Sequence, residues 1–248
     1  MPSLSSRIGP LRLPRLWREG RTGIELATLV RHPRFRHPDQ HAGRDRPVLL
    51  VPGFLAGDES LAVLAGWLRR SGFRPGGAGM RFNAGCFSAA LDALEGRAEA
   101  LRGTTGSRVA IIGQSHGGTL GRSLAARRPD LVAGVVAMGS PLIDPLAIHP
   151  VARFQVRFVG ALGSLGAPGL FSRDCLEGEC CAQVRRAAGR SFPAGVGFVS
   201  IYSRSDAIVD WRACLHPAAE HVEVRARDRK STRLNSSHCL VSRMPSSA

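Results

Sequence analysis

The sequence is poor in lysine, tyrosine and asparagine, and it has no long uninterrupted apolar run. Lys230 is the only lysine, although 34 basic residues outnumber 19 acidic ones and give a formal net charge of +15. The arginines are spread through every segment, without the basic run or interleaved aromatics typical of nucleic-acid-binding surfaces. We therefore expect no nucleic-acid partner and attribute the positive charge to arginines encoded by GC-rich codons. Another anionic partner is the alternative.

The apolar segments are too short for a transmembrane helix, and the first twenty residues carry prolines and arginines where a signal peptide has its apolar core. We expect a cytoplasmic protein. The segment Arg15 to Arg31 has the pattern of a basic amphipathic helix, which can pack on a domain or touch a membrane surface. Residues 1–46 are accordingly expected to form an N-terminal extension, with peripheral membrane contact left open.

Strand and helix patterns alternate from Pro47 onward, which is typical of a mainly parallel sheet covered by helices. The patterns predict strands within residues 47–54, 109–112, 131–141, 196–206 and 221–224. They predict helices within residues 59–73 and 88–102, and from 116 to just before Pro129. A chain of 248 residues with 44% hydrophobic content suits one large α/β domain, which we place at residues 47–227.

Residues 143–194 interrupt this alternation. They read as irregular and are rich in Gly, Pro and Cys. An insertion between two strands is a candidate cap over the carboxyl ends of the sheet, where open α/β sheets bind their ligands. Its Leu, Phe and Val content favours an apolar group as the ligand.

The segment Gly113 to Gly118 reads GQSHGG and contains the pattern Gly-x-Ser-x-Gly, centred on Ser115. Because a serine hydroxyl is a weak nucleophile, hydrolases display it on a strained turn between a strand and a helix. Flanking glycines there avoid side-chain clashes, and the helix N-terminus favours developing negative charge. A strand pattern precedes the motif and a helical pattern follows it. Ser115 is thus the candidate nucleophile, and a purely structural turn is the alternative.

These segments resemble the α/β-hydrolase family, most closely its bacterial lipase- and esterase-like members. The resemblance covers about residues 47–224 and is carried by VLLVPGF (48–54), GQSHGG (113–118) and YSRSDAIVDW (202–211). It implies the α/β-hydrolase fold, a mainly parallel sheet with helices on both faces. It also implies an oxyanion hole formed by the backbone N–H groups of Phe54 and His116, with the His116 side chain in a supporting role.

The acid of such a site should follow the nucleophile in the chain and precede the base. Asp206 fits, because it comes directly after the predicted strand that contains Val199 to Tyr202. Its role would be to orient the base and stabilise its cationic form. Asp144, after the preceding strand, is the second candidate. Asp210 is a nearby rival, since loop aspartates are commonly turn or capping residues.

The base should follow the strand predicted at residues 221–224. The resemblance implies a short Ser-His turn there and then a closing helix, whereas this chain continues RARDRKSTRLNSSHCLVSRMPSSA. His216 and His221 flank the strand on the wrong side, and His149 belongs to the insertion, so none of the three is favoured. His238 is the remaining candidate.

The final segment, residues 228–248, differs from the rest of the chain. It holds the only lysine and a cluster of serines without apolar periodicity. Back-translated, Asp228 to His238 matches a widely used short-read sequencing adapter residue for residue, and Ser242 to Ala248 matches its continuation. We therefore expect a translated adapter without regular structure, a natural sequence that departs from this one near Arg227, and a catalytic histidine that the chain lacks.

Five cysteines lie before this tail: Cys86, Cys175, Cys180, Cys181 and Cys214. Their spacing lacks the paired short intervals or histidines of zinc sites, so we expect no metal and no cofactor. One or two disulfides or free thiols are both open, and a cytosolic location favours free thiols.

Three functions agree with these features. The first is hydrolysis of carboxylic esters, including lipid esters, through an acyl-enzyme on Ser115. The second is acyl transfer or thioester hydrolysis on the same fold. The third is a non-catalytic module that binds through its basic surface. The motifs favour the first, in a chain crippled as it stands because the base is missing.

Overall fold

The computed structural model describes residues 29–145, 147–179, 182 and 191–224. The chain divides into two compact units between His37 and Pro38. In the first unit, the short helix α2 (Pro33–Arg36) begins after His32, whose imidazole accepts a hydrogen bond from the Arg34 N–H. The amphipathic helix predicted for Arg15 to Arg31 falls almost wholly outside the described residues.

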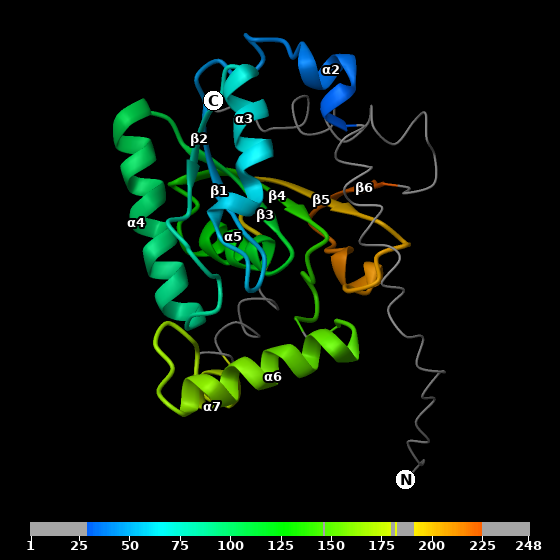
Figure 1. The fold of residues 1–248 in the computed structure, drawn as a ribbon. Coiled ribbons are helices and arrows are strands. Elements are labelled where there is room, and N and C mark those ends of the chain that lie inside the picture. The colour runs from blue at the N-terminus through cyan, green and yellow to red at the C-terminus, as the bar shows by residue number, and fades with distance from the viewer. Residues whose placement is uncertain (1–28, 146, 180–181, 183–190, 225–248) are drawn as a thin grey trace. The chain divides into compact units, whose positions relative to one another are not determined.

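In the second unit, the described residues form a sheet of six parallel strands in the order β2-β1-β3-β4-β5-β6 (Figure 1). Their bounds are β1 (Pro47–Val51), β2 (Arg74–Gly77), β3 (Val109–Gln114), β4 (Val132–Met138), β5 (Gly197–Tyr202) and β6 (Glu220–Glu223). The chain extends the sheet in one direction from β1 to β2 and then in the other from β3 onward. This reversal lies between β1 and β3. Doubly wound sheets place their sites at the carboxyl ends of the strands at such a point.

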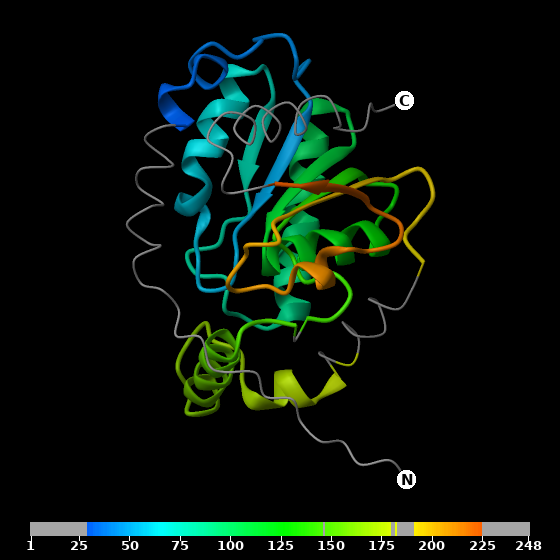
Figure 2. The same cartoon turned by 90° about the vertical axis from the view of Figure 1, so that its right-hand side faces the viewer.

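Helices cover both faces of this sheet (Figure 2). Helix α3 (Ala62–Arg70), preceded by the 3-10 turn η2 (Asp58–Leu61), lies on one face, and α4 (Phe87–Thr105) and α5 (His116–Arg127) lie on the other. All five residues of β1 are buried, as expected for a central parallel strand with helices on both faces of its sheet. Within the described residues, no helix is long and apolar enough to cross a bilayer.

The alternating architecture predicted from the sequence is confirmed, and two local expectations were wrong. Strand β2 was not predicted, because its sequence RPGG has no β-branched or aromatic residue. Pro75 is tolerated there because β2 is an edge strand paired only with β1.

The insertion at residues 143–194 is not irregular throughout. It contains the 15-residue helix α6 (Pro150–Ser164) and the short helix α7 (Arg173–Glu177), both lying beyond the carboxyl ends of the strands (Figures 1 and 2). Helix α6 begins with Pro150 at its first position and His149 as its cap, a start signal that the surrounding glycines obscured.

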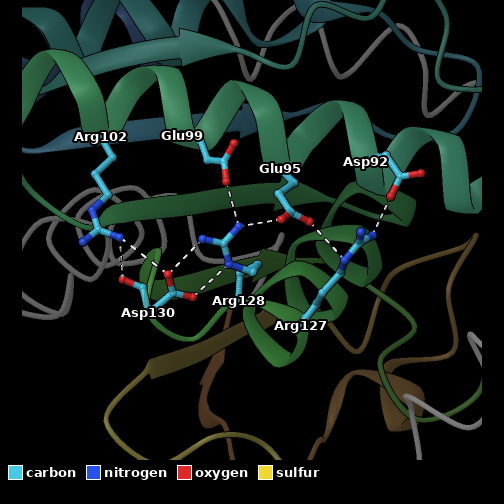
Figure 3. A network of polar contacts seen from close by, with 7 residues as sticks. All are labelled: Asp92, Glu95, Glu99, Arg102, Arg127, Arg128 and Asp130. Carbon is cyan, nitrogen blue, oxygen red and sulfur yellow. Dashed lines mark hydrogen bonds and ion pairs between the residues drawn. The ribbon is translucent and has the colours of Figure 1, made fainter.

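A network of ion pairs fastens α4 to the end of α5 (Figure 3). Arg127 pairs with Asp92, Arg128 with Glu99 and Asp130, and Glu95 contacts both guanidinium groups. Because each arginine contacts more than one carboxylate, the side chains are already oriented for every further pair, which makes a network stronger than isolated surface pairs.

We expect Arg128→Gln to lower the midpoint of thermal unfolding by a few degrees, with a smaller loss in high salt, which screens partly exposed charges. The matched control is Arg74→Gln, which removes one exposed pair with Asp45 and should leave the midpoint nearly unchanged. Equal effects of the two substitutions would show that the network adds nothing to single pairs.

Candidate functional site

Ser115 occupies a strained turn between the end of β3 and the start of α5. Its backbone has φ 50° and ψ −119°, in the positive-φ region that a non-glycine residue rarely adopts. The Ser115 N–H donates to the Met138 carbonyl at 2.8 Å, and the Ser115 carbonyl accepts from the Gly118 N–H at 3.0 Å. These bonds hold the strained residue in place at the carboxyl edge of the sheet.

The two glycines of the motif are required by backbone packing. A Cβ built on Gly113 would overlap the backbone of Gly117, and a Cβ on Gly117 would overlap the Val51 and Pro52 carbonyls. The ends of β1 and β3 and the first turn of α5 are therefore packed too closely for any side chain.

The loop after β1 passes directly beside Ser115. A Cβ built on Gly53 would lie 3.6 Å from the Ser115 Cβ, and the rings of Phe54 and His116 meet edge to face with centroids 6.3 Å apart. Among the described residues, neither the Phe54 N–H nor the His116 N–H donates a backbone hydrogen bond. The two residues whose N–H groups the sequence suggested for an oxyanion hole thus lie close to Ser115.

Asn83, which the sequence did not single out, holds the loop after β1 through hydrogen bonds. It is 2% exposed, and its side-chain amide donates to the Pro52 carbonyl at 2.8 Å. Its backbone accepts from the Leu55 N–H and donates to the Ala56 carbonyl. Three hydrogen bonds from one buried residue hold the loop on both sides of Phe54. A lone asparagine between two loops gives no sequence pattern that would single it out.

The His116 side chain packs between the Phe54 and Phe87 rings, at centroid distances of 6.3 and 5.8 Å. Desolvation lowers its pKa to about 4, so the imidazole is neutral near pH 7. It supports the turn as an apolar ring.

Asp206 lies at the same edge, in the loop after β5. Its Oδ1 accepts from the Ile208 and Val209 N–H groups at 2.8 and 3.1 Å, and its Oδ2 faces Gly139, 3.3 Å from a Cβ built there. Gly139 directly follows Met138, which accepts the Ser115 N–H. Asp206 and Ser115 therefore flank the same short stretch at the end of β4.

The two other candidate acids have different surroundings. Asp210 caps the 3-10 turn η3 (Trp211–Cys214), where its Oδ1 accepts from the Arg212 N–H at 3.0 Å. Asp144 is exposed, and its backbone carbonyl accepts a hydrogen bond from the Ala147 N–H. Of the three, only Asp206 has an atom within 4 Å of a Cβ built on Gly139, which makes it the best placed candidate.

The three histidines considered as alternative bases, His149, His216 and His221, have structural roles. His149 caps α6 by accepting from the Val151 N–H at 3.3 Å. His216 is buried against the Phe198 ring, near the amino end of β5, and the His221 Nε2 lies 2.9 Å from the His216 carbonyl oxygen. No hydrogen bond joins any of these to Ser115 or Asp206 within the described part of the chain. His238 lies outside it.

The thiols give no sign of a metal or redox centre in the described residues. Cys175 and Cys214 are free thiols, and no cluster of three metal-binding side chains occurs among the described residues. Burial and the Asp206 and Asp210 carboxylates raise the pKa of the Cys214 thiol to about 12, which makes it a poor nucleophile. Cys180 and Cys181 lie outside the described residues.

The insertion meets the site through an apolar cluster. Val159 of α6 and Phe171 are buried with Ala84, and Phe54, Val156, Leu170 and Cys175 pack around them. The Phe171 N–H also donates to the Ala84 carbonyl at 2.8 Å. The apolar cluster that includes the Phe54 side chain is therefore built partly by the insertion.

We expect Gly117→Ala to destabilise the domain by about 2–3 kcal/mol, because the new methyl group overlaps backbone atoms that cannot move aside. Gly103→Ala on α4 is the matched control, since a Cβ there meets nothing within 4 Å, and it should stabilise by about 0.5–1 kcal/mol. Urea denaturation measures both. A neutral Gly117→Ala would contradict the close packing of the turn.

Burial, with Arg122 and His221 as further causes, lowers the pKa of His216 to about 4 from a usual 6.5. As the pH falls, His216 is protonated in the unfolded chain before it is protonated in the folded one. Its contribution to the unfolding free energy is therefore fully present above pH 6.5 and is lost as the pH drops toward 4. The loss from this one group approaches about 3 kcal/mol. We expect His216→Asn to make the fall in unfolding free energy shallower, measured in urea at several pH values.

His41→Asn, a substitution at an exposed histidine, is the matched control for this measurement. If the unfolding free energies of the two variants depend on pH in the same way, His216 does not contribute to the loss of stability at low pH.

Comparison with known proteins bears on the fold. A family model described as "alpha/beta hydrolase fold" matches residues 69–162. The structure is similar to that of a mature lipase of Bacillus licheniformis, with a TM-score of 0.57 and 12% identity over 79% of this chain and 91% of that one. It is also similar to a monoacylglycerol lipase of Paleococcus ferrophilus, with a TM-score of 0.54 and 17% identity over 79% and 94% of the two chains.

A search of curated proteins by sequence gave no match. At these low identities the structural likeness establishes architecture alone, and it agrees with the six-stranded parallel sheet and the family model. The chain has the α/β-hydrolase fold.

Proposed function

We propose that the protein is a serine hydrolase of carboxylic esters that works through an acyl-enzyme on Ser115. The observation that carries the proposal is the strained backbone of Ser115 at the carboxyl end of β3, beside the Phe54 and His116 N–H groups. Such a turn costs stability and persists only when its surroundings enforce it, and here close backbone packing does so.

In the proposed reaction, the Ser115 Oγ attacks the ester carbonyl carbon while a histidine takes its proton. The carbonyl oxygen becomes an oxyanion, and the Phe54 and His116 N–H groups donate to it. Each such donor is worth about 3 kcal/mol of transition-state stabilisation. The C–O bond breaks as the histidine returns the proton to the leaving alcohol. Water, deprotonated by the same histidine, then attacks the acyl-serine and releases the acid.

Asp206 is the proposed acid. Its Oδ1 is engaged by two backbone N–H groups, and Oδ2 on the Gly139 side is left to accept the N–H of an imidazole. The base would enter from beyond β6. The Val224 N–H donates to the Tyr202 carbonyl, so the chain leaves β6 at the same edge that carries Asp206. This supports a base that follows Val224, with His238 as the candidate in the present sequence.

The substrate proposed is an ester with an apolar acyl group, because the apolar cluster of Val159, Phe171 and their neighbours adjoins Phe54. Acyl transfer to an alcohol and thioester hydrolysis would use the same groups. Comparing ester, thioester and added alcohol acceptors separates these reactions.

We expect Ser115→Ala to reduce kcat for p-nitrophenyl ester hydrolysis by at least about 10⁴-fold, because the proposed acyl-enzyme forms on the hydroxyl that this substitution removes. Ser60→Ala, which removes an exposed serine hydroxyl, should leave the rate unchanged. The assay uses the present chain and one whose sequence after Arg227 is read from source DNA. A fluorophosphonate, which phosphonylates an activated serine with loss of fluoride, and peptide mass spectrometry locate the nucleophile.

The expected pattern is an active continued chain with label on Ser115 and a present chain at least about 10³-fold slower. A present chain that is active and loses its activity in His238→Ala would make His238 the base and the tail native. Absence of Ser115 labelling in both chains would overturn the proposal.

A further inference from the structure

Helix α6 carries apolar side chains on two sides. On the inner side, Val156 and Val159 pack into the cluster around Phe171. On the outer side, Val151, Phe154 and Phe158 are 45%, 68% and 54% exposed, and Leu165, the first residue after the helix, is 84% exposed. Packing of α6 on the domain explains the inner side only.

The outer residues form a narrow stripe. At about 100° per residue, Val151, Phe154, Phe158 and Leu165 project within an arc of about 60°. The centre of that arc lies about 170° around the helix from Val156 and about 110° from Val159. The Phe154 and Phe158 rings stack at 6.3 Å along it. Exposed apolar residues that align in this way mark an interaction surface, whereas scattered ones do not.

A further exposed apolar residue is held beside the start of the helix. The His149 N–H donates to the Ile208 carbonyl at 2.7 Å, and Ile208 is 60% exposed. The loop that holds Asp206 is therefore joined by backbone to the start of α6.

Charge indicates what this surface binds. Arg153 and Arg157 are exposed and lie along one flank of the stripe, and α6 contains no acidic residue. A helix with an aromatic and aliphatic stripe flanked by arginines suits the boundary between lipid headgroups and acyl chains, where the guanidinium groups reach phosphates. At 15 residues, or about 22 Å, it would lie along such a surface.

We propose that the outer face of α6, defined by Val151, Phe154, Phe158 and Leu165 with Arg153 and Arg157, docks on an anionic lipid surface. The contact places the carboxyl edge of the sheet beside the membrane. It is independent of the catalytic proposal, because none of these six side chains belongs to the candidate site.

Flotation of the full chain with vesicles tests this surface. The vesicles are either phosphatidylcholine alone or equal parts of phosphatidylcholine and phosphatidylglycerol. We expect stronger binding to the anionic vesicles. Phe154→Ser with Phe158→Ser, and separately Arg153→Gln with Arg157→Gln, should each weaken it by about 10-fold or more. Tryptophan fluorescence and thermal unfolding establish that the variants remain folded.

Helix α3 offers matched controls with similar exposure. Val63, which is 43% exposed, is changed to Ser, and Arg69 and Arg70 are changed to Gln together. These variants should bind as the unchanged chain does. An equal loss in the arginine control would mean attraction by overall charge and would overturn the proposal.

Two other results would also overturn it. One is binding that survives both α6 double variants, which would locate the lipid contact elsewhere, the basic N-terminal segment included. The other is no vesicle binding together with self-association that Phe154→Ser with Phe158→Ser abolishes, measured by sedimentation velocity. That result would assign the face to a second copy of the chain.

Discussion

The candidate site depends on how closely three pieces of backbone approach one another at the carboxyl ends of β1 and β3. Gly113 and Gly117 let the end of β3, the first turn of α5 and the Val51 and Pro52 carbonyls come into direct contact. At this contact Ser115 takes the strained conformation. The position of Ser115 beside the Phe54 loop follows from the same approach, so the proposed nucleophile and the proposed oxyanion donors depend on one packing constraint.

Much of this arrangement could be predicted from the chain. The strands β1, β3, β4 and β5 are apolar runs bounded by Gly and Pro, a pattern that predicts buried strands. The Gly-x-Ser-x-Gly turn can be predicted because it depends on residues within the motif itself. The six-stranded sheet and helices on both faces agree with the fold expected from these motifs.

Other features could not be predicted because their causes are not local. Strand β2 forms because β1 offers it backbone partners, and nothing in RPGG favours a strand. Asn83 matters because the fold brings it under the Phe54 loop, 31 residues away from its partner Pro52. Helix α6 lies in a segment whose glycine and proline content predicts irregular structure. Pro150 in its first turn nevertheless favours a helix.

The bond between the Phe171 N–H and the Ala84 carbonyl joins main-chain groups only. Ala84 follows Asn83, so the insertion is joined by backbone to the segment that holds the Phe54 loop. This bond does not depend on which side chains the insertion carries. The apolar side chains of the insertion can therefore change over evolution, or in a designed library, without loosening that loop. If the proposed function holds, such changes would alter which acyl groups the protein accepts.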